Sequence, residues 1–253
     1  MERLDEALLA PARAKRKLSV GFARDESERR AAQRLRWRVF AEEMGARLAP
    51  GEPGIDRDEF DRWCEHLVVR DADEVIGTYR LLSPHNARRA GRYYSEGEFD
   101  LGRLERLRGD MVEVGRSCID ARYRSGAVIA LLWAGLARYM LAGRHEYLVG
   151  CASMSVADGG RAAAAVYEEL RESHLAPVEY RVFPRHPLSL EKTDAKAQMP
   201  PLLKGYLRCG AYIAGEPAWD PDFNTADFFV LLPLSRVERR YARHFLGWGG
   251  EGE

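Results

Sequence analysis

The segment from residue 111 to residue 142 constrains the fold of this chain more than any other stretch. Apolar and polar residues alternate over the first half of residues 111–119, which is typical of a half-buried strand. A short turn follows, and an apolar run over residues 126–142 then predicts a helix, with Ser125 as its N-cap and Gly143 as its stop. The sequence therefore predicts a strand that leads through a turn into a long helix.

The turn before this predicted helix has the composition of an anion-binding site. The first backbone N–H groups of a helix have no partner within it, and this end of the helix dipole is positive. An ordinary strand–turn–helix connection with surface arginines is the alternative, and the local sequence favours neither. The residues that would hold a phosphate here are Arg122, Arg124, Ser125, Gly126 and Ala127.

Hydrophobic periodicity places further helices and strands along the chain, and their mixture predicts one α/β domain. We assign residues 1–29 to a basic N-terminal extension and residues 30–253 to the domain. The other helices are predicted over residues 28–44, 158–172, 200–208 and 234–248, and the other strands over residues 66–70, 75–82, 147–154, 178–183, 211–214 and 227–232.

Composition excludes several classes of function. The 39 Lys and Arg residues balance 39 Asp and Glu residues, so the chain lacks the excess positive charge of a general nucleic-acid-binding protein. It begins with acidic residues where a signal peptide is basic, and no apolar run reaches the roughly 20 residues that span a bilayer. We therefore expect a cytoplasmic protein without a transmembrane helix.

Familiar catalytic motifs are also missing. The sequence has no phosphate-binding P-loop, no dinucleotide fingerprint and no nucleophile elbow. Its four cysteines and six histidines are not spaced as metal ligands, so we expect no metal and no permanently bound cofactor. Carboxylates, arginines and backbone dipoles remain to carry the chemistry.

Glu113 and Arg116 lie on the predicted strand just before the turn. Residues three apart on a regular strand face opposite sides, unless a bulge intervenes, and Gly115 is a natural position for one. Glu113 is then a candidate to take a proton from an attacking amine, directly or through water. A purely structural ion pair between Glu113 and Arg116 is the alternative.

Charge is distributed unevenly near the N-terminus. Residues 1–40 carry 11 basic and 6 acidic residues, whereas residues 41–75 carry 4 basic and 11 acidic ones. The acidic block directly follows the first predicted helix. It is either a solvated loop or a surface that recognises a cation.

Motifs along most of the chain resemble one family of enzymes. Over about residues 30–235 the sequence is similar to the ornithine N-alpha-acyltransferases, which begin ornithine-lipid synthesis in bacteria; homologues of this type have also been described as hemolysin-like. The motifs that carry the resemblance are LRWRVFAEEMG at 35–45, FD at 60–61, CEHLVVRD at 64–71, IGTYRLL at 76–82, EVGRSC at 113–118, LVGCAS at 148–153, PPLLKGYLR at 200–208, GEPAWD at 215–220 and FNTADF at 223–228.

A more distant resemblance is to the acyl-homoserine-lactone synthases, which share the Arg and Val-Phe of the first helix, the Phe-Asp pair, the Gly-x-x-Arg-Leu-Leu strand and the Glu-x-x-Arg strand. Both resemblances imply the GNAT fold, a twisted mixed β-sheet flanked by helices. They also imply an acyl chain taken from acyl carrier protein and given to an amino group, here the α-amine of L-ornithine. The donor is the acyl-phosphopantetheine arm of the carrier.

The resemblance implies roles for particular residues. Catalytic roles fall to Glu113, Asp61 and Arg116, and Asp61 belongs to the matched Phe-Asp pair. Arg80 or Arg116 would take the acceptor carboxylate, while acidic residues would recognise the side-chain ammonium. The substrate-binding residues implied are Arg36, Phe40, Glu43, Asp56, Asp58, Arg80, Ser117 and Ser153, and the phosphopantetheine would contact the turn at residues 122–127.

Basic segments suit an acidic carrier protein as partner. The predicted helix at residues 234–248 also has an apolar stripe beside four arginines. Such a helix can lie on an anionic membrane surface, or it can simply pack on the domain. We therefore expect acyl carrier protein as a partner and peripheral contact with the inner membrane through this helix.

The acyl group can reach the amine by two routes. Cys118 or Cys151 could form an acyl-enzyme, but neither has a histidine nearby in sequence to activate it. We therefore favour direct attack of the amine on the thioester. Alternatives are an N-acyltransferase for glycine, lysine or an autoinducer precursor, a membrane-binding hemolysin-like protein, and a non-catalytic GNAT-like module.

Overall fold

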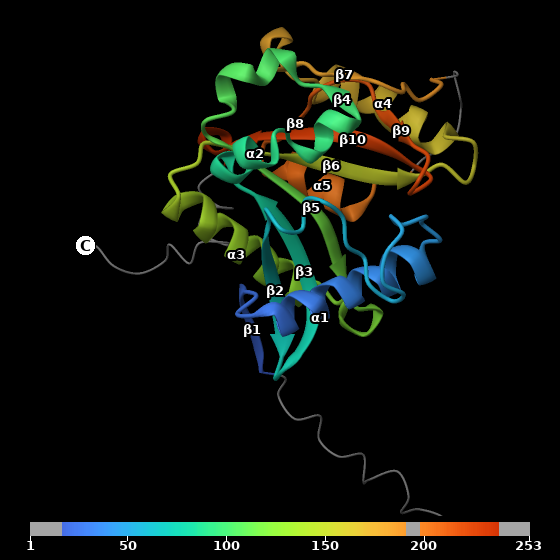
Figure 1. Cartoon of the computed structure of the whole chain (residues 1–253). Coiled ribbons are helices and arrows are strands. Elements are labelled where there is room, and N and C mark those ends of the chain that lie inside the picture. Colours follow the sequence, from blue (N-terminus) through green and yellow to red (C-terminus); the bar gives the residue numbers. More distant parts are fainter. Residues whose placement is uncertain (1–16, 191–197, 238–253) are drawn as a thin grey trace, which may run out of the picture.

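The computed structural model describes residues 17–190 and 198–237 (Figure 1). Its main sheet has the strand order β1-β2-β3-β5-β6-β10-β8, with β9 paired to β10. Neighbouring strands are antiparallel except β5 and β6, which are parallel. The predicted α/β architecture, a mixed sheet flanked by helices, is confirmed.

Most elements fall where periodicity predicted them. The strands are β1 (Leu18–Phe22), β2 (Glu65–Asp71), β3 (Glu74–Leu82), β4 (Phe99–Asp100), β5 (Met111–Ile119), β6 (Tyr147–Ser155), β7 (Phe183–Pro184), β8 (Tyr212–Ile213), β9 (Ala218–Asp220) and β10 (Thr225–Pro233). The α-helices are α1 (Glu26–Trp37), α2 (Pro84–Ala90), α3 (Ala127–Ala142), α4 (Arg161–Ser173) and α5 (Pro201–Arg208). Shorter turns of helix are η1 (Arg38–Glu43), η2 (Tyr94–Gly97), η3 (Gly102–Leu107), η4 (Ala121–Tyr123), η5 (Val178–Tyr180) and η6 (Leu234–Arg236).

Helices cover both faces of the sheet, which we call the α3 face and the α1 face. On the α3 face, α3, α4 and α5 pack on a core that includes Leu132 and Leu203. On the α1 face, α1 packs over β2, β3 and β5 around Leu35 (Figure 1). The segment from α2 to η3 covers the rest of this face around Phe99. Alternate strand residues thus enter different cores, as a two-sided sheet requires.

The predicted first helix is continuous but changes its geometry. Asp25 caps α1, because its side chain accepts a hydrogen bond from the backbone N–H of Glu28. After Trp37 the chain continues as the π-helical turn η1, which buries Val39 and Phe40. π-Helical turns are rare in proteins, and those that occur often lie at functional sites. Phe40 therefore enters the interior from an irregular turn.

The predicted strand at residues 178–183 is wrong. The chain forms the 3₁₀ turn η5 there, and only Phe183 and Pro184 pair as β7, with β4. Pro177 and Pro184 lack the N–H that a sheet ladder needs, and Val178 is 60% exposed. Apolar character alone therefore misled the prediction at this position.

Two other predictions concern the ends of the chain. The predicted helix at 234–248 begins as the 3₁₀ turn η6, and from residue 238 it lies outside the described residues. The division at residue 29 stays a prediction. Within the described part of residues 1–29, however, β1 pairs with β2, so it belongs to the sheet.

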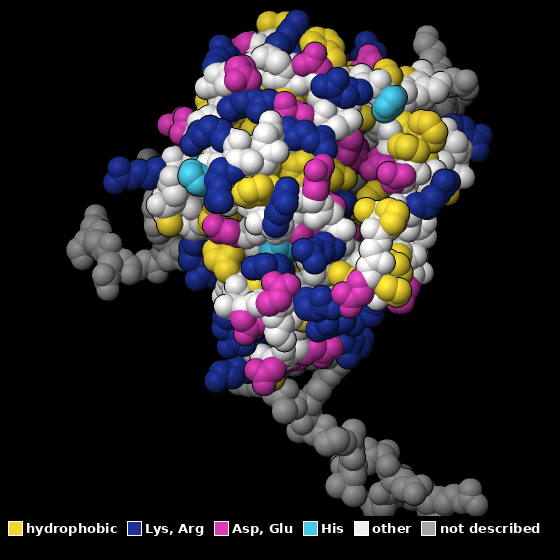
Figure 2. Space-filling view, in the orientation of Figure 1, with side chains coloured by type: hydrophobic (Ala, Val, Ile, Leu, Met, Phe, Trp, Pro, Cys, Tyr) yellow, Lys and Arg dark blue, Asp and Glu magenta, His cyan; other side chains and the backbone are white. Residues whose placement is uncertain are grey.

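The surface on the α1 side carries both signs of charge. Figure 2 shows Lys and Arg side chains spread over this face with Asp and Glu side chains between them. Several arginines stack on aromatic rings, among them Arg89 on Trp63 and Arg92 on Phe60. Within the described part of the chain, no helix is long and apolar enough to span a bilayer.

Candidate active site

The centre of the site is a bulge in β5. Thr78 on β3 faces Cys118 on β5, and Arg80 faces Gly115. The two β3 residues are two positions apart, whereas their partners on β5 are three positions apart. The extra residue on β5 coincides with Arg116, whose φ of 52° is left-handed. The bulge predicted here is confirmed, although Arg116 rather than glycine carries the unusual conformation. It turns Glu113 and Arg116 to the same face, and both side chains bond Tyr94.

The parallel strands β5 and β6 separate next to this bulge. Their pairing covers only Met111–Glu113 with Tyr147–Val149. A cavity of about 800 Å³ lies where pairing stops, lined by residues 114–119 of β5 together with Cys151 and Ser153 of β6. Its other walls come from α3 and α5 on one face and from η1 and η2 on the other. The cavity therefore passes between two strands and reaches both faces of the sheet.

Glu113 sits at the α1-face side of the cavity and is 5% exposed. It accepts hydrogen bonds from the backbone N–H of Tyr94 at 2.6 Å and of Ser95 at 2.8 Å, and from the Ser95 hydroxyl. Burial raises the pKa of Glu113, although these hydrogen bonds oppose the rise. The carboxylate thus holds η2 in position, and its raised pKa makes it a stronger base than an ordinary glutamate.

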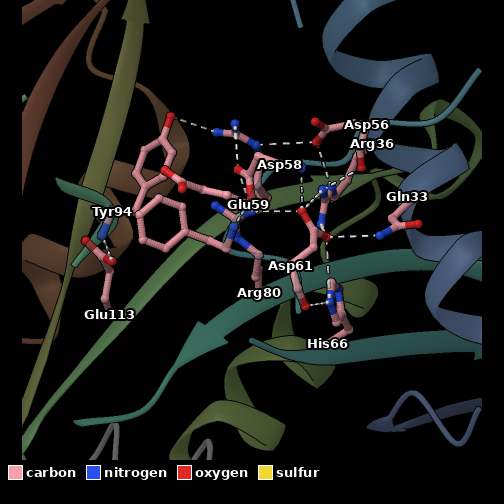
Figure 3. Close-up of polar contacts among 12 residues, drawn as sticks. Gln33, Arg36, Asp56, Asp58, Glu59, Asp61, His66, Arg80, Tyr94 and Glu113 are labelled. Atoms are coloured by element: carbon pink, nitrogen blue, oxygen red, sulfur yellow. Dashed lines mark hydrogen bonds and ion pairs between the residues drawn. The ribbon is translucent and has the colours of Figure 1, made fainter. Parts of the chain in front are cut away.

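The acidic residues expected to meet the acceptor form a buried ion-pair cluster instead. We call it the Arg–Asp cluster. Arg36, 0% exposed, bonds Asp56 through Nε at 2.7 Å and Asp61 through Nη1 at 2.8 Å (Figure 3). Arg80 bonds Asp58 at 2.7 Å and Asp61 at 3.1 Å. Burial raises the pKa of Asp61, but Arg36 and Arg80 outweigh it and hold this pKa far below its usual range.

Arg116 connects this cluster with the cavity. Its contacts are long: 3.2 Å to the Tyr94 hydroxyl, 3.3 Å to Asp56 and 3.4 Å to Asp58. Its guanidinium lies over the rings of Tyr94 and Phe223, at 5.0 and 4.5 Å from their centroids. Arg116 lines the cavity, so it can present a cation there while the rings hold it in place.

A second group of carboxylates lies at the cavity, and sequence reasoning missed it. We call Glu98, Asp220 and Asp227 the acidic cluster. Asp220 and Asp227 line the cavity, while the Glu98 carboxylate contacts the Cys151 thiol at 3.5 Å and Asp227 behind it. Asp227 also accepts a hydrogen bond from Thr225 at 2.8 Å. No ion pair joins these three carboxylates to a basic side chain among the described residues.

Without a cationic partner in the part of the chain that the structure describes, two of these carboxyls have raised pKa values. Burial and the neighbouring carboxylates raise the pKa of Glu98 well above its ordinary value, and burial likewise raises the pKa of Asp227. A hydrogen bond between the two carboxyls further raises the pKa of Glu98 and lowers that of Asp227. A cationic group that enters the cavity would favour the ionised form of these carboxyls and pair with them.

Glu98, Cys151 and Asp227 are also the group best placed to hold a metal ion. Their donor atoms lie within 4.8 Å of one another. Burial raises the pKa of the Cys151 thiol well above its ordinary value, and the pKa values of both carboxyls are raised too. A metal would bind these atoms only after all three side chains had lost their protons, so the raised pKa values oppose metal binding.

The turn at the start of α3 forms one end of the cavity. Ser125 is not the N-cap: Gly126 holds that position with a φ of 94°, and no side chain caps the helix. The prediction for Ser125 is therefore wrong, because a left-handed glycine shapes the turn. Arg124 lines the cavity and pairs with Glu43 at 2.7 Å, whereas Arg122 turns to Asp120 and Glu74.

The structure brings together only part of the residue set implied by sequence. Predicted residues that line the cavity are Phe40, Glu43, Arg80, Glu113, Arg116, Ser117, Arg124, Gly126 and Ser153. Those outside the cavity lining are Arg36, Asp56, Asp58, Asp61, Arg122, Ser125 and Ala127. The missed residues Asp220 and Asp227 lie inside motifs that carry the family resemblance, and this was the available signal.

Known proteins agree with this architecture. Residues 35–134 match the acetyltransferase (GNAT) domain family. The solved structure of the acyl-homoserine-lactone synthase LasI superimposes with a TM-score of 0.56 at 14% identity, covering 94% of this chain and 99% of that one. FeeM, an N-acyl amino acid synthase from uncultured soil microbes, superimposes with a TM-score of 0.53 at 13% identity, covering 88% of this chain and 94% of that one. The domain match and the superpositions together show that this chain has the GNAT fold.

Sequence relatives narrow the class. The L-ornithine N(alpha)-acyltransferase of Agrobacterium fabrum is 37% identical, covering 93% of this chain and 86% of that protein. The enzyme of the same name from Rhodobacter capsulatus is 37% identical, and the match covers 89% of this chain and 93% of that protein. The chain belongs to the L-ornithine N(alpha)-acyltransferase family, as the sequence motifs indicated.

The Arg–Asp cluster makes a prediction about stability. Replacing Arg36 with Met leaves Asp56 and Asp61 buried without their main partner, so the free energy of unfolding falls by about 3–5 kcal/mol. Urea unfolding followed by circular dichroism measures it. Arg30→Met is the control, since the Arg30–Glu52 pair is 35% and 56% exposed and contributes about 0–1 kcal/mol. Equal losses in both variants would contradict the structural role of Arg36.

The acidic cluster makes a prediction about pH. Because the folded-state pKa values of Glu98 and Asp227 are raised, folding takes up protons, and this contribution to stability declines as pH rises above the unfolded pKa of about 4. Glu98→Gln removes one of the two groups. We therefore expect its free energy of unfolding to fall less than that of the wild type between about pH 5 and pH 8.

Urea titrations at both pH values test this prediction. Glu42→Gln is the control, because Glu42 is exposed, and its pH dependence should match that of the wild type. The idea of a proton-holding acidic cluster fails if Glu98→Gln also matches the wild type.

Proposed function

We propose that the protein transfers an acyl chain, in the family a 3-hydroxyacyl chain, from the thioester of acyl carrier protein to the α-amine of L-ornithine, which yields lyso-ornithine lipid. One observation carries the proposal. The cavity joins an apolar part between α3 and α5, the bulged strand β5 and the acidic cluster in a single space. An acyl chain, a thioester and a cationic amino acid need these three surroundings. The names of the sequence relatives support ornithine as the acceptor.

Ornithine would lie on the α1 face. Its carboxylate pairs with Arg116, whose present contacts of 3.2–3.4 Å are weak enough to be exchanged. Its side-chain ammonium pairs with Asp220 and Asp227, with Glu98 behind them. These assignments move the cation contact from Asp56, Asp58 and Asp61, whose oxygens are engaged by arginines, to the carboxylates that line the cavity.

The donor would enter at the start of α3. The exposed lining residues at this turn are Glu43, Met44, Arg124 and Gly126. The free N–H groups of the first helical turn and the Arg124 guanidinium suit the phosphate of the phosphopantetheine arm. The arm then runs between β5 and β6, where the separated strand leaves β5 backbone N–H groups to bind the thioester oxygen.

The reaction needs no covalent enzyme intermediate. The neutral α-amine attacks the thioester carbon, the C–N bond forms, and the C–S bond breaks. Glu113 takes the amine proton, directly or through water, and the leaving thiolate is protonated as the product departs. Burial raises the pKa of the Cys118 thiol to about 12 and that of the Cys151 thiol well above its ordinary value, which makes both poor nucleophiles.

Incubation of the purified protein with 3-hydroxyacyl carrier protein and a panel of ornithine, lysine and glycine tests the function. We expect two products, free thiol and an amide on the α-nitrogen of ornithine. A thiol assay measures the first, and fragmentation mass spectrometry locates the second. Asp227→Asn should raise the KM for ornithine about 10-fold to 100-fold, because it removes a charge-assisted hydrogen bond. The matched control, Asp222→Asn, changes an exposed residue of the turn between β9 and β10 and should leave KM unchanged.

The other outcomes of this panel are equally informative. Equal use of glycine would discard the role given to the acidic cluster and keep the reaction class. Absence of thiol release with every acceptor, from folded protein, would refute the proposed transfer and favour a membrane-binding or non-catalytic protein.

Glu113 has a separate test, since it both positions η2 and serves as the proposed base. Glu113→Gln should lower kcat at least about 100-fold and remove the acid limb of the pH–rate profile. Ser95→Ala removes the hydroxyl that bonds Glu113 but keeps its carboxylate, so we expect it to retain the acid limb. If Glu113→Gln folds and keeps the wild-type pH–rate profile, the role of Glu113 is limited to positioning η2.

A further inference from the structure

The part of the cavity on the α3 face is an apolar arm between two helices. Three residues of α3 and three of α5 face it, each set at positions i, i+1 and i+4, which share one side of a helix. No charged side chain of either helix lines the cavity. The six residues are Ile129, Ala130 and Trp133 of α3, and Pro201, Leu202 and Gly205 of α5.

The arm has a definite end along α3. The cavity starts at Gly126, at the exposed turn, and Trp133 is the last residue of α3 that lines it. The next residues on the sheet-facing side, Leu136 and Met140, are buried in the core and do not line the cavity. Seven residues of helix span about 10 Å, so the cavity extends roughly this far along α3.

Trp133 is held firmly in this position. Its ring stacks on Tyr206 with centroids 5.1 Å apart and an angle of 29° between the planes. A Cβ on Gly205 would lie only 2.7 Å from the indole Cη2, so this position must be a glycine for the ring to fit. Tyr206 is in turn hydrogen-bonded to the hydroxyl of Tyr79 on β3. The indole is thus a braced wall.

We propose that Trp133, braced by Gly205 and Tyr206, forms the end of the acyl-binding arm and sets the length of the acyl chain that the enzyme accepts. The inference rests on the proposed function, because it assigns the apolar arm to the donor chain. The opposite end of the cavity carries Asp220 and Asp227, where an alkyl chain would bury carboxylates against apolar groups. The arm at α3 and α5 is therefore the side that an acyl chain occupies.

This assignment predicts a sharp dependence of binding on chain length. Each further methylene buried in the arm should tighten binding about fourfold until the chain reaches the indole. Beyond that length the chain must displace a braced ring, so affinity should stop rising and then fall.

Binding of S-alkyl pantetheine thioethers of increasing chain length, measured by calorimetry, tests the inference without the acceptor. Trp133→Ala opens the end of the arm, so its optimum should move to longer chains. Trp133→Phe keeps a ring against Tyr206 and should move it less, which also covers the case in which the alanine variant fails to fold. Gly205→Ala places a methyl group against the indole, which must then shift, so this variant should also change the optimum.

A matched control lies on the same helix. Leu141 is 44% exposed and outside the cavity, so Leu141→Ala should keep the wild-type optimum. An unchanged optimum in folded Trp133→Ala and Trp133→Phe overturns the inference, even where ornithine acylation is intact. The wild-type protein could instead bind the thioethers with the expected dependence on chain length and yet fail to acylate ornithine. That result would overturn the proposed acceptor but not the role of Trp133.

Discussion

The buried Arg–Asp cluster is the interaction on which the site depends. Arg36 and Arg80 hold Asp61 between them, and both lie almost wholly out of water. Removing such charges from water costs several kcal/mol for each ion, and only close, well-aligned pairing offsets this cost. The cluster therefore contributes little as a source of net stability. Its effect is specificity: it fixes the loop before β2 to α1 and β3 in one arrangement.

That arrangement determines the shape of the cavity. Asp56 and Asp58 contact Arg116, the residue in left-handed conformation on the β5 bulge. A non-glycine residue in that conformation is strained, and it persists only where its surroundings over-determine it. The bulge in turn places Glu113 and Arg116 on the same face beside the point where β5 leaves β6. A change deep in the cluster is thus transmitted to the reaction centre through one arginine.

Local sequence patterns predicted most elements and few of the tertiary relations. The hairpin of β2 and β3, the strand β5 and the helix α3 each carry their periodicity within one segment, so they were predictable. Glu113 and Arg116 were predictable as a pair because they lie three positions apart on one strand, with a glycine between them. The strand at 178–183 failed because Pro177 and Pro184 outweigh apolar character there.

The Arg–Asp cluster and the acidic cluster show why the sequence could not predict which carboxylates line the cavity. Asp56, Asp58 and Asp61 looked like a solvated or cation-binding block, because their arginine partners come from α1, β3 and β5. Conversely, Glu98 and Asp227 are 129 positions apart, and only the pairing of β10 with β6 and the return of the chain before β4 bring them together. No periodic pattern encodes such an encounter.

The contrast between the two groups separates structure from function. In the Arg–Asp cluster every carboxylate is paired with a guanidinium, so it is complete without a ligand. In the acidic cluster the described residues supply no basic partner, and burial raises the pKa values of Glu98 and Asp227. Uncompensated buried carboxylates lower the stability of the folded state. Their presence beside a cavity is therefore best explained by a positively charged group that arrives with the substrate and completes the pairing that the chain leaves unfinished.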